Sequence, residues 1–193
     1  MCICVYRELF PDSKCLFMYR DVENVAKSSY RSTQVVPSAY LLTQVGKLSP
    51  RVGQIFLNSM GLHGADFCIR LDGDLAFGVL LSALMTSFYL DARRRGFDIR
   101  AIRYEDLVAR PLDMCRVILE FCHLPASLAQ LAVNAFDVDS QRNSLLAKSV
   151  IGRIKDPEMT PEAKVKVNEL LKKFELPLVG EPNVIEGILT CAE

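Results

Sequence analysis

The sequence has no excess of charge of either sign. Its 193 residues include 23 lysines and arginines and 23 aspartates and glutamates, so the formal net charge is zero. A protein that attracts nucleic acid through its overall field needs a surplus of positive charge. We therefore expect no nucleic-acid partner, and any anion-binding site must be made by a few local residues.

The sequence also lacks the cysteine spacing of a common metal site and an apolar run of membrane length. Its seven cysteines include no Cys-x-x-Cys pair, so we predict no metal and reduced thiols in a reducing, cytoplasmic compartment. A targeting or anchor segment upstream of Met1 is compatible with this. The longest uncharged run, Leu75–Leu90, has 16 residues, whereas a membrane span needs about 20. It predicts a buried helix that begins after Asp72-Gly73-Asp74 and ends near Arg95.

What is present is a stretch, Lys14–Arg31, that indicates a strand, a sharp turn and a helix. Cys15–Tyr19 is an unbroken apolar run, typical of a strand buried on both faces of a parallel sheet. Asp21 is a good helix N-cap, and the residues that follow it contain no glycine or proline. Arg20 thus lies at the strand end, where open α/β sheets bind their ligands, and Ser28 lies two turns into the helix.

These two residue types suit a phosphate group. An arginine offers a planar fork of donors that matches phosphate oxygens, and a serine hydroxyl adds a donor from the helix. From spacing alone a plainer interpretation is favoured, in which Arg20 and Asp21 form a local salt bridge and Ser28 is an ordinary helix-surface residue.

The stretch resembles the 3′-phosphate-binding segment of the sulfotransferases that use 3′-phosphoadenosine 5′-phosphosulfate (PAPS). In that family a strand ends in arginine, and a serine eight residues later joins it on the 3′-phosphate. Val25-Ala26 before Ser28 and Tyr30 after it also fit the family pattern. The resemblance implies that Arg20 and Ser28 bind the 3′-phosphate of PAPS.

A second match lies downstream, where residues 102–108 read Ile-Arg-Tyr-Glu-Asp-Leu-Val and Pro111 follows. It is similar to the family's Tyr-Glu-Asp-Leu segment, and this implies that Tyr104 lies beside the adenine. The alternative from spacing alone is a core tyrosine at a strand end. Lys148, Gly152 and Arg153 lie about where the family places its closing phosphate-binding residues, although the Arg-Lys-Gly triplet is absent. We carry Lys148 and Arg153 as candidate cofactor-binding residues.

The predicted fold class is α/β, a single sulfotransferase-like domain over residues 1–193 with a P-loop NTPase-like parallel sheet flanked by helices. The second strand, Asp98–Arg103, is expected to run parallel to the first, because a long connection that contains helices is what parallel strands require. Further helices are expected within residues 34–60, from Pro111 to about His123, and after the Thr160-Pro161-Glu162 cap. Residues 176–193 are expected to form a C-terminal tail.

The family's phosphosulfate-binding loop is missing, since no glycine-rich loop of P-loop type occurs in the sequence. No general base is assignable either, because His63 in a probable loop has no partner that sequence reveals. The chain therefore looks like an N-terminally truncated sulfotransferase. The family reaction is sulfuryl transfer from PAPS, a co-substrate, to an acceptor hydroxyl or amine on a small molecule or carbohydrate, and the isolated chain is expected to turn over slowly or not at all.

Two other interpretations stay open. The first is a catalytically inactive sulfotransferase remnant or interaction domain, which the missing loop favours and the intact Arg20 and Ser28 disfavour. The second is a mainly helical binding module in which both motif matches are chance, and a helix at Cys15–Tyr19 would support it. Because a missing first strand would expose a sheet edge, self-association is a further hypothesis.

Overall fold

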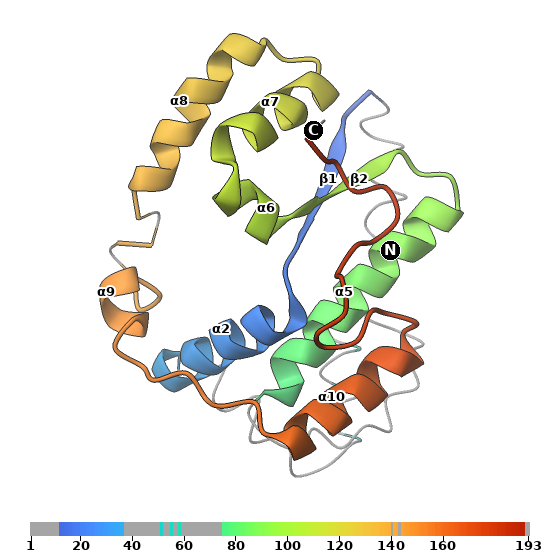
Figure 1. The fold of residues 1–193 in the computed structure, drawn as a ribbon, viewed down its shortest axis with the longest axis vertical. Helices are drawn as coiled ribbons and strands as arrows, with labels where there is room; N and C mark the ends of the chain where they lie inside the picture. Colours follow the sequence, from blue (N-terminus) through green and yellow to red (C-terminus); the bar gives the residue numbers. More distant parts are fainter. Residues whose placement is uncertain are drawn as a thin grey trace.

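The computed structural model describes residues 12–36, 51, 55, 58, 75–139, 141–142 and 144–191. Within them the protein is mixed α/β, mostly helical, with a small parallel sheet of two strands (Figure 1). The elements are β1 (Cys15–Tyr19), α2 (Val22–Val35), α5 (Ala76–Arg94), β2 (Ile99–Arg103), α6 (Tyr104–Ala109), α7 (Pro111–Phe121), α8 (Ala129–Asn134), α9 (Lys148–Ile151) and α10 (Pro161–Lys173), with single 3-10 turns at Ala126–Leu128 and Ala135–Asp137.

The two strands pair in parallel, as the sequence predicts. Their register runs from Cys15 opposite Ile99 to Tyr19 opposite Arg103. Because parallel strands end at the same edge of a sheet, the residues that follow Tyr19 and Arg103 emerge side by side. Cys15–Tyr19 is thus a strand, not the helix that would support the helical-module alternative.

The expectation that β1 is buried on both faces is wrong. Phe17 and Tyr19 pack into a cluster with Tyr89 of α5, and Leu16 packs on the opposite side against a cluster around Met114 of α7. Met18 belongs to neither cluster and is 51% exposed. The described chain therefore covers β1 better on the face that points to α5, where Tyr19 is buried and Phe17 partly buried, than on the opposite face.

The largest core cluster joins α2, α5 and α10, which lie together in the lower part of Figure 1. Ala26 of α2, Leu80 of α5 and Leu171 of α10 are almost completely buried in it. Glycine allows α2 and α5 to approach closely, because a Cβ atom added at Gly78 would overlap the side chain of Ser29. This packing fixes α2 relative to the sheet, since α5 also contacts both strands.

Several predicted helix ends are confirmed. Pro111 is the first residue of α7, Thr160 caps α10 by accepting a hydrogen bond from the Ala163 N–H, and α5 ends at Arg94 with Arg95 as its C-cap, where the sequence predicts an end near Arg95. The Asp72-Gly73-Asp74 cap, His63 and nearly all of the predicted helices within residues 34–60 lie outside the described residues. In the part of the chain that the structure describes, no helix has both the length and the apolar character needed to cross a bilayer.

Residues 176–191, here called the C-terminal segment, pack along β2. Ala101 forms a parallel bridge with Ile188, in which the Ala101 N–H donates to the Gly187 carbonyl at 3.0 Å and the Leu189 N–H donates to the Ala101 carbonyl at 2.8 Å. Ile185 is only 5% exposed and belongs to the cluster beneath the sheet. The stretch expected to be a tail therefore completes the core next to the strand ends.

Candidate nucleotide site

Arg20 and Tyr104 meet at the carboxyl ends of the two strands. The register places Tyr19 opposite Arg103, so the next residue of each segment lies at the same edge of the sheet. The Cζ atom of Arg20 is 4.3 Å from the centroid of the Tyr104 ring. This is a close cation–π contact, which holds the guanidinium over the ring face. Two residues that the sequence analysis assigns to one ligand are thus neighbours, and Tyr104 is half-buried, not a core residue.

The charge of Arg20 is only weakly paired. Its nearest carboxylate oxygen is Glu105 Oε1, 4.0 Å from Nε, and the side chain is 36% exposed. The Nε atom is buried and has no hydrogen-bond partner among the described residues. The plainer interpretation of a local pair with Asp21 is wrong, because Asp21 pairs with Arg103. Arg20 therefore keeps donors that an anion is able to use.

Asp21 occupies the N-cap position of α2, as predicted, but its side chain does not cap the helix. Both carboxylate oxygens instead accept hydrogen bonds from Nη2 of Arg103, at 3.1 and 3.0 Å. These bonds raise the pKa of the Arg103 guanidinium above its ordinary value. The Asp21 carboxylate binds the Arg103 guanidinium and not the neutral N–H groups at the start of α2, because a charge-assisted hydrogen bond is the stronger one.

Glu105 ties the turn after β1 to the start of α6. Its Oε1 atom accepts a hydrogen bond from the Asp21 N–H at 3.2 Å and one from Asn24 Nδ2 at 2.9 Å. Its other oxygen, Oε2, lies 3.8 Å from Arg103 Nε. The sequence analysis missed Glu105 as a site residue, although its place beside Tyr104 in the Tyr-Glu-Asp-Leu match is a signal that would have found it.

Asn183 of the C-terminal segment reaches the same turn from the opposite side. Its Nδ2 atom donates to the Arg20 carbonyl at 3.2 Å and to Asp21 Oδ1 at 3.3 Å. Its own carbonyl accepts the Tyr19 hydroxyl at 2.9 Å. Asn183 thus contacts three consecutive residues at the end of β1. No pattern in the sequence distinguishes this asparagine, because the stretch around it has no strand or helix periodicity.

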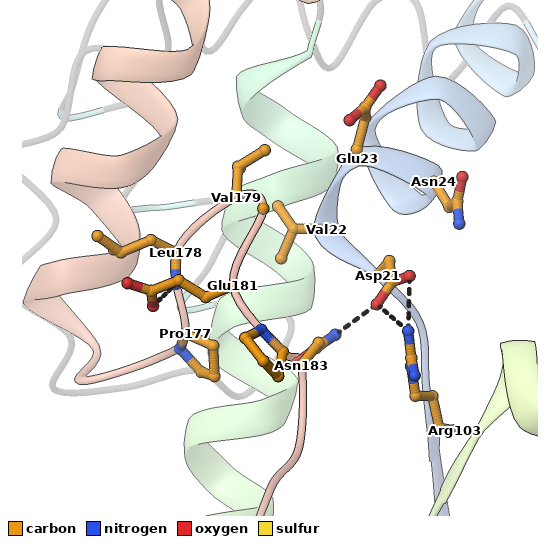
Figure 2. A pocket seen from close by; sticks show the side chains of 12 residues that line it. Asp21, Val22, Glu23, Asn24, Arg103, Pro177, Leu178, Val179, Glu181 and Asn183 are labelled. Carbon is orange, nitrogen blue, oxygen red and sulfur yellow. Dashed lines mark hydrogen bonds and ion pairs between the residues drawn. The ribbon is translucent and has the colours of Figure 1, made fainter.

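A cavity of about 350 Å³ opens beside this turn. Figure 2 shows its walls, which are the first turn of α2 and the loop at residues 177–183, with Asp21 bonded to Arg103 and Asn183 at its edge. Three carboxylates line it, those of Asp21, Glu23 and Glu181, and one cation, that of Arg103. The net charge of these lining residues is negative, so the cavity does not suit a phosphate. Of the two arginines at this edge, Arg20 is more exposed than Arg103.

The remaining predicted residues lie along α2 and α9. Ser28 is half-buried in the middle of α2, and its hydroxyl has no hydrogen-bond partner among the described residues. Lys148 and Arg153 are exposed, in and just after α9, which packs beside α2 (Figure 1). Among the described residues no contact joins Lys148 or Arg153 to Arg20 or Tyr104. The structure thus brings together one pair of the five predicted residues, and places Ser28 on α2, Lys148 on α9 and Arg153 in the turn that follows α9.

Comparison of this chain with family models, with curated proteins and with solved structures found no match.

Proposed function

We propose that this chain binds an adenine nucleotide with a 3′-phosphate, of which PAPS is the form that the sequence resemblance implies. The single observation that carries the proposal is the meeting of Arg20 and Tyr104 at the carboxyl ends of two parallel strands. In open α/β sheets this edge is where ligands bind.

The chemistry of the pair suits the two ends of such a nucleotide. The Arg20 guanidinium matches phosphate oxygens, and its 36% exposure, with Glu105 Oε1 at 4.0 Å, leaves it able to donate. Tyr104 offers a flat apolar surface to a purine on the part of its ring that Arg20 does not cover. Ser28, Lys148 and Arg153 are the additional phosphate donors in this proposal.

The reaction in this proposal is the family reaction, sulfuryl transfer to the hydroxyl or amine of a small-molecule or carbohydrate acceptor. Such transfer needs the acceptor and the leaving phosphate to be held in line and the developing charge to be stabilised. We assign the nucleotide-binding part of this task to Arg20 and Tyr104, and we assign no general base.

The test is calorimetric titration with 3′,5′-adenosine bisphosphate and with adenosine 5′-monophosphate. A charged hydrogen bond contributes about 1.5–3 kcal/mol, so Arg20→Ala should weaken binding of the bisphosphate by roughly 10- to 150-fold. Ser28→Ala should cost about 0.5–1.5 kcal/mol. Binding of the monophosphate, which lacks the 3′-phosphate, should change little in either variant.

Arg100→Ala is the matched control, because Arg100 lies on β2 and pairs only at 3.6 Å with Asp98. It should leave the affinities for both nucleotides unchanged. Equal losses for the two nucleotides in Arg20→Ala would mean that Arg20 supports the fold and does not bind the phosphate. Sulfate transfer from PAPS to a phenol, steroid or sugar is the separate measurement for catalysis.

A further inference from the structure

The peptide group between Arg20 and Asp21 is held at both of its polar atoms by side chains from distant parts of the chain. The Arg20 carbonyl accepts a hydrogen bond from Asn183 Nδ2 at 3.2 Å. The N–H of Asp21, on the opposite side of the same peptide plane, donates to Glu105 Oε1 at 3.2 Å. Neither atom has its partner within β1 or α2, so this peptide belongs to no regular ladder.

Both holding residues are themselves fixed. The backbone carbonyl of Asn183 accepts a hydrogen bond from the hydroxyl of the buried Tyr19 at 2.9 Å. The C-terminal segment is bonded to β2 through both the N–H and the carbonyl of Ala101. Glu105 also accepts from Asn24 at 2.9 Å and lies in the first turn of α6. The peptide group is therefore held between the C-terminal segment and the start of α6.

The two hydrogen bonds restrain the backbone from which the Arg20 side chain starts. A peptide is planar and trans, so holding its carbonyl and its N–H restrains the position of the whole group, while β1 holds the chain just before Arg20. From the Cα atom so placed, the side chain reaches the Tyr104 ring, where its Cζ lies 4.3 Å from the centroid. If either hydrogen bond is lost, we expect this Cα atom to shift and the contact with the ring to loosen.

We propose that Glu105 and Asn183 are positioning residues, which together aim the Arg20 guanidinium at the anion site. The geometric part of this proposal concerns the free protein. Its consequence for affinity rests on the proposed function, in which Arg20 binds the 3′-phosphate. The C-terminal segment is then part of the nucleotide site, although none of its residues needs to contact the nucleotide.

Glu105 has two separable effects on the site. Its Oε1 holds the Asp21 N–H, and its negative charge lies 4.0 Å from Arg20 Nε. Glu105→Gln keeps an oxygen that accepts from Asp21 and Asn24 but removes the charge. Glu105→Ala removes both. Glutamine at this position should therefore preserve the direction of Arg20 and should strengthen anion binding, because a competing carboxylate is gone.

The first measurement needs no ligand. In the nuclear magnetic resonance spectrum, the ring current of Tyr104 should displace the side-chain resonances of Arg20, and Tyr104→Leu identifies this displacement. Asn183→Ala and Glu105→Ala should abolish most of the displacement, whereas Glu105→Gln should retain it. Asn183→Asp, which has the same shape but no amide donor, should behave like Asn183→Ala.

Asn168→Ala is the matched control for the C-terminal segment. Asn168 Oδ1 accepts a hydrogen bond from the Val179 N–H at 2.9 Å, so this variant also removes one side-chain anchor of the segment, at a distance from Arg20. It should leave the Arg20 resonances in place. Slow hydrogen exchange at the Leu189 amide, which bonds to Ala101, reports in every variant that the segment is still docked.

The second measurement is titration with 3′,5′-adenosine bisphosphate. The loss of one hydrogen bond to the turn should weaken its binding by roughly 2- to 10-fold in Asn183→Ala. Glu105→Ala and Glu105→Gln both lack the competing carboxylate, so the matched comparison is between these two variants, and the alanine variant should bind the bisphosphate more weakly by about the same factor. The monophosphate should be unaffected, as should both nucleotides in Asn168→Ala. In the Arg20→Ala background, Asn183→Ala should cause no further loss, because it acts only through Arg20.

The two proposals fail in distinguishable ways. Arg20 resonances that stay displaced in Asn183→Ala and Glu105→Ala, with Leu189 still protected, overturn the positioning role whatever the nucleotide does. Resonances that respond as expected in a protein that shows no preference for the 3′-phosphate support the positioning role and overturn the proposed function.

Discussion

A single nitrogen of Arg103, Nη2, donates to both carboxylate oxygens of Asp21, at 3.1 and 3.0 Å. This contact joins the end of β2 to the turn after β1. The same guanidinium lies 3.8 Å from Glu105 and 3.7 Å from Asp106. One arginine thus faces three carboxylates at the strand ends, whereas Arg20 at the same edge pairs with Glu105 at 4.0 Å.

We predict that Arg103→Lys destabilises the protein, because a lysine ammonium is a compact charge without the planar fork of donors. Hydrogen bonds to charged groups contribute about 1.5–3 kcal/mol when buried. For this half-buried pair the expected fall in the free energy of unfolding is about 1–2 kcal/mol, measured by urea denaturation. Arg100→Lys, on the same strand with one 3.6 Å pair, should cost about 0–1 kcal/mol. Equal losses in the two variants would contradict a special role for Arg103.

The second prediction concerns stability at alkaline pH. Burial raises the pKa of Tyr19 to about 12, while an unfolded tyrosine ionises near about 10. The folded state thus favours the neutral phenol. The contribution of this neutral phenol to the free energy of unfolding is complete below about pH 10 and is lost as the pH rises to about 12.

Tyr19→Phe removes this ionisation and keeps the ring that lies parallel to Phe17, 6.4 Å from it. Since one pKa unit corresponds to about 1.4 kcal/mol, the wild type should lose about 1–3 kcal/mol more than the variant over that range. Urea denaturation at a series of pH values gives both curves. Parallel curves would show that Tyr19 ionises in the folded protein as easily as in the unfolded one.

The third prediction tests the close approach of α2 and α5. Gly78→Ala places a methyl group against Ser29, where it overlaps the side chain. Overpacking of this kind costs about 1–3 kcal/mol, against a gain of about 1 kcal/mol from replacing glycine in a helix. We expect a net loss in thermal stability.

Ser29→Gly provides the partner for a double-mutant cycle. In that background Gly78→Ala should no longer destabilise, because the overlapping atoms are gone, and the coupling between the two sites should be favourable. Additive effects of the two changes would mean that the helices separate to accept the methyl group.

The parts of the fold that the sequence predicts are those with a local signal. Cys15–Tyr19 is an apolar run bounded by charged residues. Thr160-Pro161-Glu162 is a three-residue pattern typical of the start of a helix. The strand ends place Arg20 and Tyr104 together, because two parallel strands of five residues finish in register. For this pair, sequence position determines spatial position.

The parts that the sequence does not predict depend on competition between distant groups. Asp21 has the identity and position of a cap, yet Arg103, 82 residues away, takes its carboxylate. Asn183 lies where no periodicity marks a structural role, and Met18 is exposed within a run that reads as buried. In each case the contacts and burial of the residue depend on side chains that are distant in the sequence, and a local sequence pattern does not contain that information.

The bond from Asn183 to the Arg20 carbonyl spans 163 residues of chain. Ribosomes add about 5–20 residues per second, so Arg20 is made roughly 8–30 s before the residue that braces it. β1 lacks its partner strand for about the first half of that interval and lacks the hydrogen bond from Asn183 for all of it, and a contact of such long range forms slowly even afterwards. A nascent chain interrupted before Asn183 has Arg20 and Tyr104 but lacks the hydrogen bond that we propose directs Arg20 toward the ring, so this edge of the sheet is completed only after Asn183 has been added.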